Sequence, residues 1–456
     1  MQFRPSETGV DGGGRLMRRW QAPTGGRAPT SSAFAPGKPP VKDPLPLPIL
    51  HFLGWSTGAL FFFYAWVLRV APSVMIDEMM RDLSVGGAVI GNLSAVYFFG
   101  YAGMQVPVGL LIDRFGPRRL MTAAALVCAG GCVIFAASSG ITGVAAGRFL
   151  IGASAAFSLV GAMSIAVLWF PARRFALLSG LAMMLGMAGG VVGQAPLRLA
   201  VSALDWRGAV LALAAGGVLL AIAAWATVRD RPKERGSSGQ MLAGLGRVAG
   251  NRQTWLIAVA GLGTTGPLLG FAGLWGVPYF VATLGIDRAA AASITSMVFV
   301  GWGIGAPLVG WASDRIGRRR SPFILGLVIC TVAMSAILAF PGLPIPVLMA
   351  LCFACGFGGS SQIAGFAAAR EHNPAAFSGT ALGIVNGIVT GAGALFQPLL
   401  GWLLDLNWQG RLVDGARVYD LAAYRIAFIA IIVGCVIGLL CTLALRETYC
   451  KPLEEK

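Results

Sequence analysis

The feature that most constrains this chain is a series of apolar runs between residues 49 and 446. Twelve of these runs are long enough to cross the hydrocarbon core of a bilayer, which takes roughly 20 apolar residues in a helix. Backbone groups inside a bilayer must be satisfied within the segment that carries them, as they are in a helix. The runs therefore predict an all-α membrane protein with twelve transmembrane helices. They cover residues 49–75, 88–112, 119–138, 142–169, 174–199, 208–228, 254–283, 290–313, 321–340, 345–369, 377–404 and 424–446.

The composition supports this class and argues against an enzyme. Of the 456 residues, 56% are hydrophobic and only 12% are charged, whereas soluble domains carry roughly 25% charged residues. The polar residues form no catalytic constellation, and His51 and His372 are too few for a histidine-based metal site. Cys352 and Cys355 form a C-x-x-C pair inside an apolar run, where small packing residues are expected. We therefore predict no enzymatic activity, no metal and no cofactor.

Basic residues gather in alternate connections between the runs. They occur in the N-terminal segment and in the stretches DRFGPRR, PARRF, RDRPKER and DRIGRRR, whereas connections such as IDEMMRDL and LGIDRA carry few. Cytoplasmic connections of membrane proteins are enriched in Lys and Arg. The pattern predicts a multi-pass protein of the cytoplasmic (inner) membrane with both termini in the cytoplasm. It also accounts for the net charge of +16 in a protein whose partner is the lipid bilayer and not nucleic acid.

The two halves of the chain repeat one another. The stretch GLLIDRFGPRR begins at Gly109 and GWASDRIGRRR begins at Gly310, so Asp113 and Asp314 occupy equivalent places. Parallel repeats about an axis along the membrane normal are a known transporter architecture. We therefore expect two pseudo-symmetric six-helix bundles. The predicted boundaries are a disordered cytoplasmic tail at 1–47, an N-terminal bundle at 48–228, a cytoplasmic linker at 229–253, a C-terminal bundle at 254–446 and a cytoplasmic tail at 447–456.

These residues resemble the motifs of the major facilitator superfamily. The repeated G-x-x-x-D-R-x-G-x-R pattern is similar to that superfamily's signature, and Arg148 and Gly152 in GRFLIG are similar to its R-x-x-x-G motif. The stretch LDWRG before the sixth run is also common in the superfamily. The resemblance covers about residues 48–446 and implies a secondary transporter that works by alternating access.

The resemblance also implies a conformational latch on the cytoplasmic side. Asp113 lies near the C-terminal end of its own helix, where the helix dipole disfavours a carboxylate, whereas the N-terminal end of the eleventh helix favours one. Asp314 has the same relation to the fifth helix. The alternative is that the arginines of the motif only set the topology. The expected latch residues are Asp113, Arg114, Arg118, Asp314, Arg315 and Arg318.

Arg69 lies inside the first apolar run, with no acidic residue after it until Asp77 and Glu78. A charge in hydrocarbon is costly, so Arg69 either snorkels to the interface as an anchor or binds an anion in a water-filled cavity. Pro72 favours the cavity because its ring disrupts the helical bond to the Leu68 carbonyl and kinks the helix. Superfamily transporters of organic phosphates and organic anions also place an arginine on the first helix. The resemblance, which extends to proteobacterial amino-acid carriers, therefore implies that Arg69 holds an anionic group.

Other polar residues within the runs could complete this site. The alternative for each of them is a hydrogen bond between helices, and for Arg148 it is also a structural bond to helix ends or a place at the outer interface. The seventh run lacks the second arginine of the organophosphate antiporters, so a single carboxylate is easier to accommodate than a dianionic phosphate. The expected substrate-binding residues are Arg69, Tyr64, Tyr97, Arg148, Gln194, Gln362 and Asn386.

These observations favour a monomeric transporter whose substrate is a small carboxylate-bearing metabolite, either an organic anion or an amino acid. No Asp or Glu lies inside any apolar run, which argues against a carboxylate proton relay. Anion exchange, facilitated diffusion and other forms of proton coupling stay open. The alternative functions are an efflux carrier for a hydrophobic compound and a transporter-like ligand sensor.

Overall fold

The computed structural model describes residues 47–230, 246–374 and 377–451, except for the side chains at 47, 48, 106, 110, 113, 172, 173 and 176. Nearly all of the predicted N-terminal tail, most of the predicted linker at 229–253 and the last residues of the predicted C-terminal tail lie outside the described residues. The described chain is almost entirely helical, which confirms the predicted fold class.

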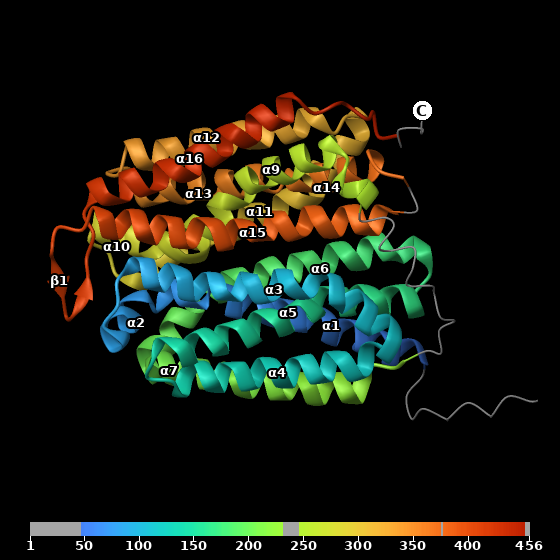
Figure 1. The fold of residues 1–456 in the computed structure, drawn as a ribbon, viewed down its shortest axis with the longest axis horizontal. Helices are drawn as coiled ribbons and strands as arrows, with labels where there is room; N and C mark the ends of the chain where they lie inside the picture. Colours follow the sequence, from blue (N-terminus) through green and yellow to red (C-terminus); the bar gives the residue numbers. More distant parts are fainter. Residues whose placement is uncertain (1–46, 231–245, 375–376, 452–456) are drawn as a thin grey trace, which may run out of the picture. The chain divides into compact units, whose positions relative to one another are not determined.

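The helices from each half of the sequence gather together, in blue and green for the first half and in yellow to red for the second (Figure 1). The first group contains α1 (Leu47–Val70), η1 (Ala71–Val74), α2 (Ile76–Leu83), α3 (Gly87–Phe115), α4 (Pro117–Ala137), α5 (Ile141–Trp169), α6 (Ala172–Val192) and α7 (Ala195–Thr227). The second contains α9 (Arg252–Gly266), η2 (Pro267–Trp275), α10 (Gly276–Leu284), α11 (Arg288–Ile316), α12 (Arg320–Ala339), α13 (Ile345–Gly359), α14 (Gln362–Glu371), α15 (Ser378–Leu406) and α16 (Leu421–Leu443).

Every predicted apolar run falls on helical residues, but the number of clear spans is lower than the predicted twelve. By length and apolar composition, ten helices of the described chain can cross a membrane, or up to eleven if α2 and α3, bent by 113°, count as one span. The apolar part of α6, Leu177–Val192, is shorter than these. The described residues therefore supply ten to eleven clear candidates for the twelve predicted spans.

Several spans are interrupted at positions that hydropathy does not reveal. The first run changes from α1 to the 3-10 helix η1 at Ala71, beside Pro72, because proline cannot donate the helical hydrogen bond. The seventh run becomes the π-helix η2 at Pro267 and returns to α-helix at Gly276. Asp205, with φ 59° and ψ 175°, breaks α7, so the first part of α7 continues the fifth run and the rest forms the sixth.

A short antiparallel hairpin, β1 (Leu412–Val413) and β2 (Ala416–Arg417), connects α15 to α16. Its turn residues Asp414 and Gly415 have φ of 49° and 81°. Positive φ at both central residues matches the type I′ turn that Asp-Gly favours in two-residue hairpins. The hairpin is the one departure from the all-α class in the described chain.

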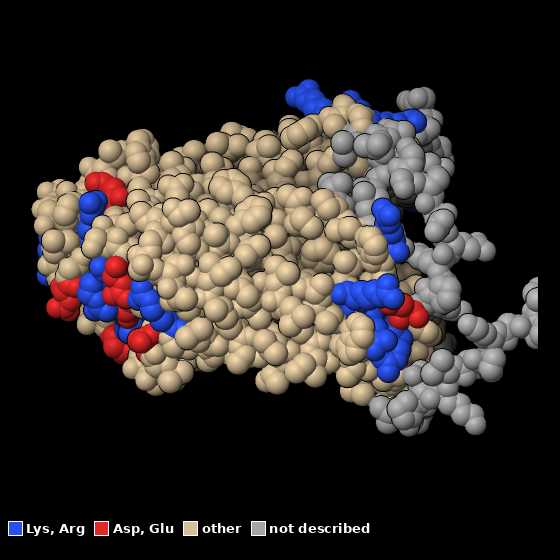
Figure 2. Space-filling view, turned by 60° about the horizontal axis from the view of Figure 1, so that its bottom comes forward, with Lys and Arg blue, Asp and Glu red and all other residues tan. Residues whose placement is uncertain are grey.

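Charged side chains on the visible face of the molecule lie near its two ends, with an uncharged belt between them (Figure 2). One end carries α2 and the hairpin, and we call it the hairpin end. The opposite end carries the start of α1 and the DRIGRRR stretch, where basic side chains dominate, and we call it the basic end (Figures 1 and 2). An uncharged belt between charged ends is the surface expected of a protein that crosses a bilayer.

Helices α3 and α15, one from each half of the sequence, approach closely near the hairpin end. A Cβ atom on Gly401 would lie 2.2 Å from the Gly87 carbonyl oxygen, and one on Gly91 would lie 2.4 Å from the Gln397 carbonyl oxygen. Nearer the basic end, a Cβ atom on Gly103 or Gly383 would meet nothing within 4 Å. The two backbones are therefore in contact near the hairpin end, and the same helices border open space toward the basic end.

Candidate functional site

Arg69 lies in the last turn of α1, where the negative end of the helix dipole favours a cation. The residue is only 5% exposed, so it does not reach the surface as an interfacial anchor would. Its guanidinium carbon lies 4.2 Å from the ring centre of Trp66, 4.8 Å from that of Tyr101, 5.4 Å from that of Tyr97 and 5.9 Å from that of Phe98. Aromatic faces attract a cation, and they replace part of the water that burial removes.

The hydrogen bonds of Arg69 are far from saturated. Its Nε donates to the Tyr97 hydroxyl at 3.4 Å, and Tyr101 is a second side-chain partner. A guanidinium has five N–H donors, and the rings around it accept none of them as strongly as an anion would. The side chain is therefore fixed by aromatic contacts, and most of its donors remain available for a ligand.

Arg148 reaches the same place from α5, and it is 2% exposed. Its Nη1 donates to the Leu68 carbonyl at 2.8 Å, which is the carbonyl that Pro72 cannot serve because proline has no backbone N–H. Its Nη2 donates to the Ser94 carbonyl at 3.4 Å, and its Nε has no partner among the described residues. These bonds match the structural alternative for Arg148, namely a donor to a helix end.

The two arginines share the ring of Tyr97. The guanidinium carbon of Arg148 lies 5.0 Å from that ring centre and that of Arg69 lies 5.4 Å from it. Neither arginine forms an ion pair with a carboxylate in the described part of the chain. Two neighbouring positive charges without an acid repel one another, so an anion placed beside them would be stabilised. We call Arg69, Tyr97 and Arg148 the arginine cluster.

Tyr64 lies apart from this cluster, contrary to the expectation that it would help to form the site. Its hydroxyl donates to the Leu213 carbonyl of α7 at 2.8 Å and lies 3.7 Å from the Cys132 sulfur of α4. Tyr64 and Arg69 are five residues apart on a helix with 3.6 residues per turn, so they project from different faces. The geometry supports the alternative of a hydrogen bond between helices.

The other polar candidates also form contacts between helices, and none of their described contacts involves Arg69. Gln194 donates from Nε2 to the Ala272 carbonyl of η2 at 2.9 Å. Asn386 of α15 donates to Gln105 of α3 at 3.4 Å. Gln362 accepts a hydrogen bond from Thr264 at 3.1 Å within the second half of the chain. Gln194 and Asn386 thus join the two halves, and a role for these residues in binding substrate stays a prediction.

The motif residues at the basic end make their described contacts within their own halves. Arg118 donates from its backbone to Asp230 at 2.9 Å and from Nε to the Trp225 carbonyl at 2.9 Å. Arg114 lies against Phe115, and Arg315 lies against Trp311, both on their own helices. Arg318 is exposed, and the side chain of Asp113 lies outside the described residues. The latch between the halves therefore stays a prediction.

Asp314 pairs with Arg319, which is not among the latch residues expected from the sequence. The Arg319 Nη1 lies 2.6 Å from Asp314 Oδ1, and its Nη2 lies 2.9 Å from Glu371 Oε1. Partial burial alone lowers the pKa of Arg319, but hydrogen bonds with Glu371 and Asp314 outweigh it and raise the pKa above its usual value. Glu447 caps the start of α12 by accepting from the backbone N–H groups of Arg319 and Arg320. In this basic-end cluster of one arginine and three acids the arginine is paired with carboxylates, unlike those of the arginine cluster.

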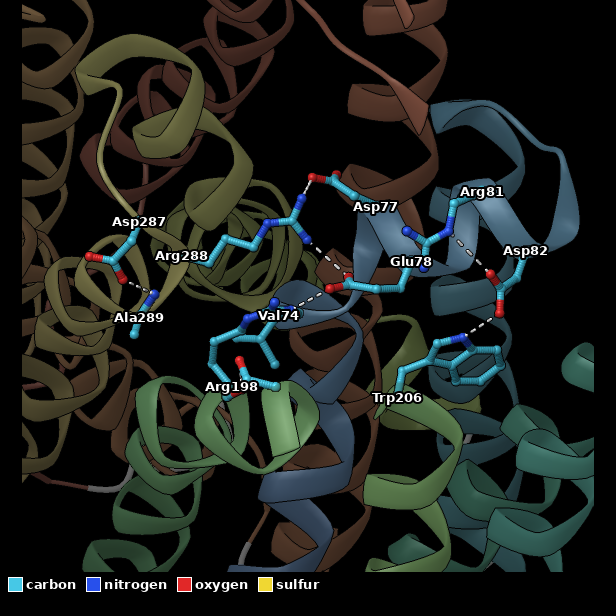
Figure 3. A network of polar contacts seen from close by, with 11 residues as sticks. Val74, Asp77, Glu78, Arg81, Asp82, Arg198, Trp206, Asp287, Arg288 and Ala289 are labelled. Carbon is cyan, nitrogen blue, oxygen red and sulfur yellow. Dashed lines mark hydrogen bonds and ion pairs between the residues drawn. The ribbon is translucent and has the colours of Figure 1, made fainter. Parts of the chain in front are cut away.

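Charged residues also join the two halves at the hairpin end (Figure 3). Arg288, at the start of α11, pairs with Asp77 and, at 2.9 Å, with Glu78 of α2. Glu78 also accepts a 2.6 Å hydrogen bond from Arg198 of α7. Asp77 and Glu78, the acids that follow Arg69 in sequence, are therefore engaged with other arginines and do not neutralise Arg69.

Of the aromatic neighbours of Arg69, Tyr97 was expected from the sequence, whereas Trp66, Phe98 and Tyr101 were not. Trp66 precedes Arg69 by three residues, and Tyr97 precedes Tyr101 by four, which are the spacings of side chains on one helix face. That signal was present, but aromatic residues at helical spacing in an apolar run are common in membrane helices. Only the packing of α1 and of α3 against α5 brings the two pairs together.

These features define a multi-pass helical membrane protein with repeated halves and a buried cationic site. The model of the Major Facilitator Superfamily matches residues 55–276 and again residues 254–455. The chain belongs to this superfamily, and it is accordingly a secondary transporter and not an enzyme.

Comparison with solved structures shows the same fold. The chain is similar to the crystal structure of a bacterial homologue of the human lysosomal transporter Spinster, in an inward-facing and unoccupied conformation, with a TM-score of 0.73 and 16% identity. The match covers 87% of this chain and 98% of that chain. At this level of identity the match shows only that the fold is shared.

Three curated relatives align over most of the chain. Uncharacterized transporter YybO of Bacillus subtilis is 24% identical over 80% of this chain and 88% of its own length. Probable nitrate/nitrite transporter NarK2 of Mycobacterium tuberculosis is 28% identical over 74% of this chain and 84% of its own length. The gentisate transporter of Corynebacterium glutamicum is 25% identical over 73% of this chain and 77% of its own length.

Proposed function

We propose that this transporter carries a small organic anion with a carboxylate group, and that Arg69 binds the carboxylate. The observation that carries the proposal is the arginine cluster, in which two buried guanidinium groups share one tyrosine ring and neither is paired with an acid of the described residues. A buried charge that lacks a partner costs free energy. Such a site is retained where a ligand supplies the missing charge, and in membrane proteins an ionisable residue at this depth marks a substrate pathway.

Arg69 and Arg148 have different tasks in this proposal. The planar fork of a guanidinium matches the two oxygens of a carboxylate, and Arg69 has the donors to form it. Arg148 donates one hydrogen bond to the Leu68 carbonyl and thereby holds the end of α1 in place. Its charge adds to the positive potential at Tyr97, and its unpaired Nε offers a further donor. Tyr97 separates the two guanidinium groups and orients Arg69 through its hydroxyl.

The names of the relatives agree with an anionic substrate. Nitrate, nitrite and gentisate, which occur in the names of two of these proteins, are all anions at neutral pH. The relatives share a quarter or so of their residues with this chain, which is enough to favour a class of substrate but not one compound. The aromatic rings around Arg69 are compatible with a flat or partly apolar body behind the anionic group.

We also infer that the basic end faces the cytoplasm in the inner membrane. Basic side chains are concentrated there (Figure 2), and cytoplasmic connections carry the excess of Lys and Arg. The described chain starts and ends at this same end (Figure 1), which fits two cytoplasmic termini. Tags placed at either terminus or in the 229–253 connection should all be accessible from the cytoplasmic side, and a tag found on the other side would contradict this orientation. We further propose that the transporter acts as a monomer, because each chain contains both halves of the repeat.

Uptake into proteoliposomes tests the proposed substrate class. The panel should contain nitrate, gentisate, small mono- and dicarboxylates, amino acids, phosphate esters and neutral hydrophobic compounds, with and without the same compound inside the vesicles. We expect saturable uptake of at least one carboxylate, and faster uptake with internal anion if the transporter exchanges anions. Transport of neutral hydrophobic compounds alone would favour the efflux carrier, and carboxylate binding without any transport would favour the ligand sensor.

A further inference from the structure

Asp405 of α15 caps the first turn of α3, which belongs to the other half of the chain. Its two carboxylate oxygens accept hydrogen bonds from the backbone N–H of Gly87 at 3.0 Å and of Ala88 at 2.8 Å. Tyr419 donates to the same carboxylate at 2.6 Å, and Arg417 lies 3.1 Å from it. Burial and the Asp405 carboxylate raise the pKa of Tyr419 above its usual value, so its hydroxyl remains protonated and continues to donate.

This cap has no substitute within α3 itself. The residue before the helix is Gly86, which has no side chain to accept the free N–H groups. A Cβ atom on Gly86 would lie 2.7 Å from Asp405 Oδ2 and 2.7 Å from Arg417 Nη1, so a longer capping residue does not fit while the cap is in place. Free N–H groups at a helix N-terminus need a partner, and here that partner comes entirely from the other half.

Two other helices that start at the hairpin end are capped from within their own half. Asp287 accepts from the backbone of Ala289 and Ala290 at the start of α11, and Asp420 accepts from Ala423 at the start of α16. These two aspartates stay with their helices when the halves move relative to one another. Asp405 cannot do so, because its acceptor atoms and the N–H groups of α3 belong to different halves.

We propose that Asp405 is a latch for the hairpin end, whose bond to the start of α3 holds that end closed and must break before the transporter can open there. The place of the cap agrees with the packing, since α3 and α15 touch at Gly87 and Gly401 and border open space toward the basic end. Arg417 and Tyr419 hold the carboxylate in position from the C-terminal half. The pairing of Arg288 with Asp77 and Glu78 is a second contact that joins the two halves at the hairpin end.

The latch is the reverse of the one expected at Asp113 on the same pair of helices. There an acid at the basic end of α3 is expected to face the start of α15, and here an acid at the hairpin end of α15 caps the start of α3. The two contacts would then alternate as the halves rock, with one formed while the other is broken. The inference at Asp405 rests only on membership of a transporter family and is independent of the proposed anionic substrate.

The test is a distance measurement across the hairpin end in the full-length protein. Spin labels at Gly140→Cys and Gly342→Cys report from one loop of each half, at exposed positions where a Cβ atom meets nothing within 4 Å. The partly exposed Cys441 and Cys450 are first replaced by serine, whereas the other native cysteines are buried. Pulsed electron spin resonance in lipid then gives the populations of closed and open hairpin ends.

Asp405→Asn should shift the ratio of open to closed hairpin ends by roughly ten-fold or more, because hydrogen bonds to a charged acceptor are worth at least that factor. The matched control is Asp420→Asn, which weakens a cap within one half and should leave the ratio unchanged. Tyr419→Phe should shift the ratio in the same direction by a smaller factor, and it keeps the proposal testable if Asp405→Asn does not fold. A wild-type distance distribution in folded Asp405→Asn, or an equal shift in Asp420→Asn, would overturn the latch.

Discussion

The arginine cluster and the basic-end cluster place similar side chains in opposite electrostatic settings. Arg319 is held by Asp314 and Glu371, so its charge is cancelled by the protein itself. Arg69 and Arg148 are more deeply buried and have no carboxylate partner in the described chain. The difference separates an arginine that stabilises the fold from one whose partner must be supplied from outside. Substitution of Arg69 should therefore lower ligand affinity, whereas substitution of Arg319 should lower stability.

The largest expected effect is on ligand affinity at Arg69. Arg69→Ala should cost about 1.5–3 kcal/mol of binding free energy through the loss of charged hydrogen bonds, which is one to two orders of magnitude in Kd. Arg69→Lys keeps the charge but loses the planar fork, and it should retain weak binding. Calorimetry on purified protein with the tightest carboxylate of the uptake panel gives both values, and Arg425→Lys at the hairpin end serves as a control that should bind as the wild type does.

At the basic-end cluster the same truncation should act on stability instead. Arg319→Ala leaves Asp314 and the mostly buried Glu371 without their cation, and we expect a loss of about 1–2 kcal/mol, since the cluster is partly open to solvent. Thermal unfolding in detergent measures the change as a lower Tm. Carboxylate affinity in the folded fraction should be unaltered, and a loss of affinity comparable to that of Arg69→Ala would break the distinction between the clusters.

Arg148 belongs to the arginine cluster but also has a structural role, and a substitution at Pro72 allows that structural role to be measured separately. Arg148→Gln should cost about 1 kcal/mol of stability, because the buried Leu68 carbonyl loses its donor. Pro72→Ala restores a backbone N–H that can serve that carbonyl, so Arg148→Gln should be less destabilising in a Pro72→Ala background. A double-mutant cycle on Tm or on the free energy of unfolding measures this coupling, and strictly additive effects would contradict the structural role.

The smallest expected effect is at Tyr64. Tyr64→Phe removes one hydrogen bond to the Leu213 carbonyl and should cost about 0.5–1.5 kcal/mol of stability. Carboxylate affinity should remain that of the wild type, because Tyr64 faces α4 and α7 and not the arginine cluster. Reduced affinity in a stably folded Tyr64→Phe protein would return Tyr64 to the candidate site.

The sequence alone was enough to predict the fold class and to single out Arg69 and Arg148 as candidates. It did not predict that the two side chains lie close together. Hydropathy finds helices because the bilayer demands apolar segments of a set length, and a charge such as Arg69 stands out against that background. The distance between Arg69 and Arg148 depends on how α1, α3 and α5 pack, and no local pattern encodes it. The bond of Tyr64 to the Leu213 carbonyl of α7 was not foreseen for the same reason, since that partner is distant in sequence.

The arginine of the basic-end cluster could have been found from the repeat. Arg118 in the first motif is equivalent to Arg319 in the second, by the same offset that relates Asp113 to Asp314. The expectation chose Arg318, one residue earlier in a run of three arginines. Gly317 has φ 70° and ends α11, and the turn that follows decides which arginine points toward Asp314 and Glu371. Asp405 was missed because an acid near a helix end resembles an ordinary loop residue until its partner is known.

The most direct test of the account is a thermodynamic cycle between Arg69 and the ligand's carboxylate. Binding of the tightest carboxylate in the panel, and of its neutral carboxamide analogue, is measured by calorimetry for the wild type and for Arg69→Ala. If the guanidinium binds the carboxylate, the wild type should prefer the carboxylate by one to two orders of magnitude, corresponding to about 1.5–3 kcal/mol, and Arg69→Ala should lose most of that preference. An undiminished preference in Arg69→Ala would show that the anionic group is recognised elsewhere and would contradict the assignment of Arg69 as the anion site.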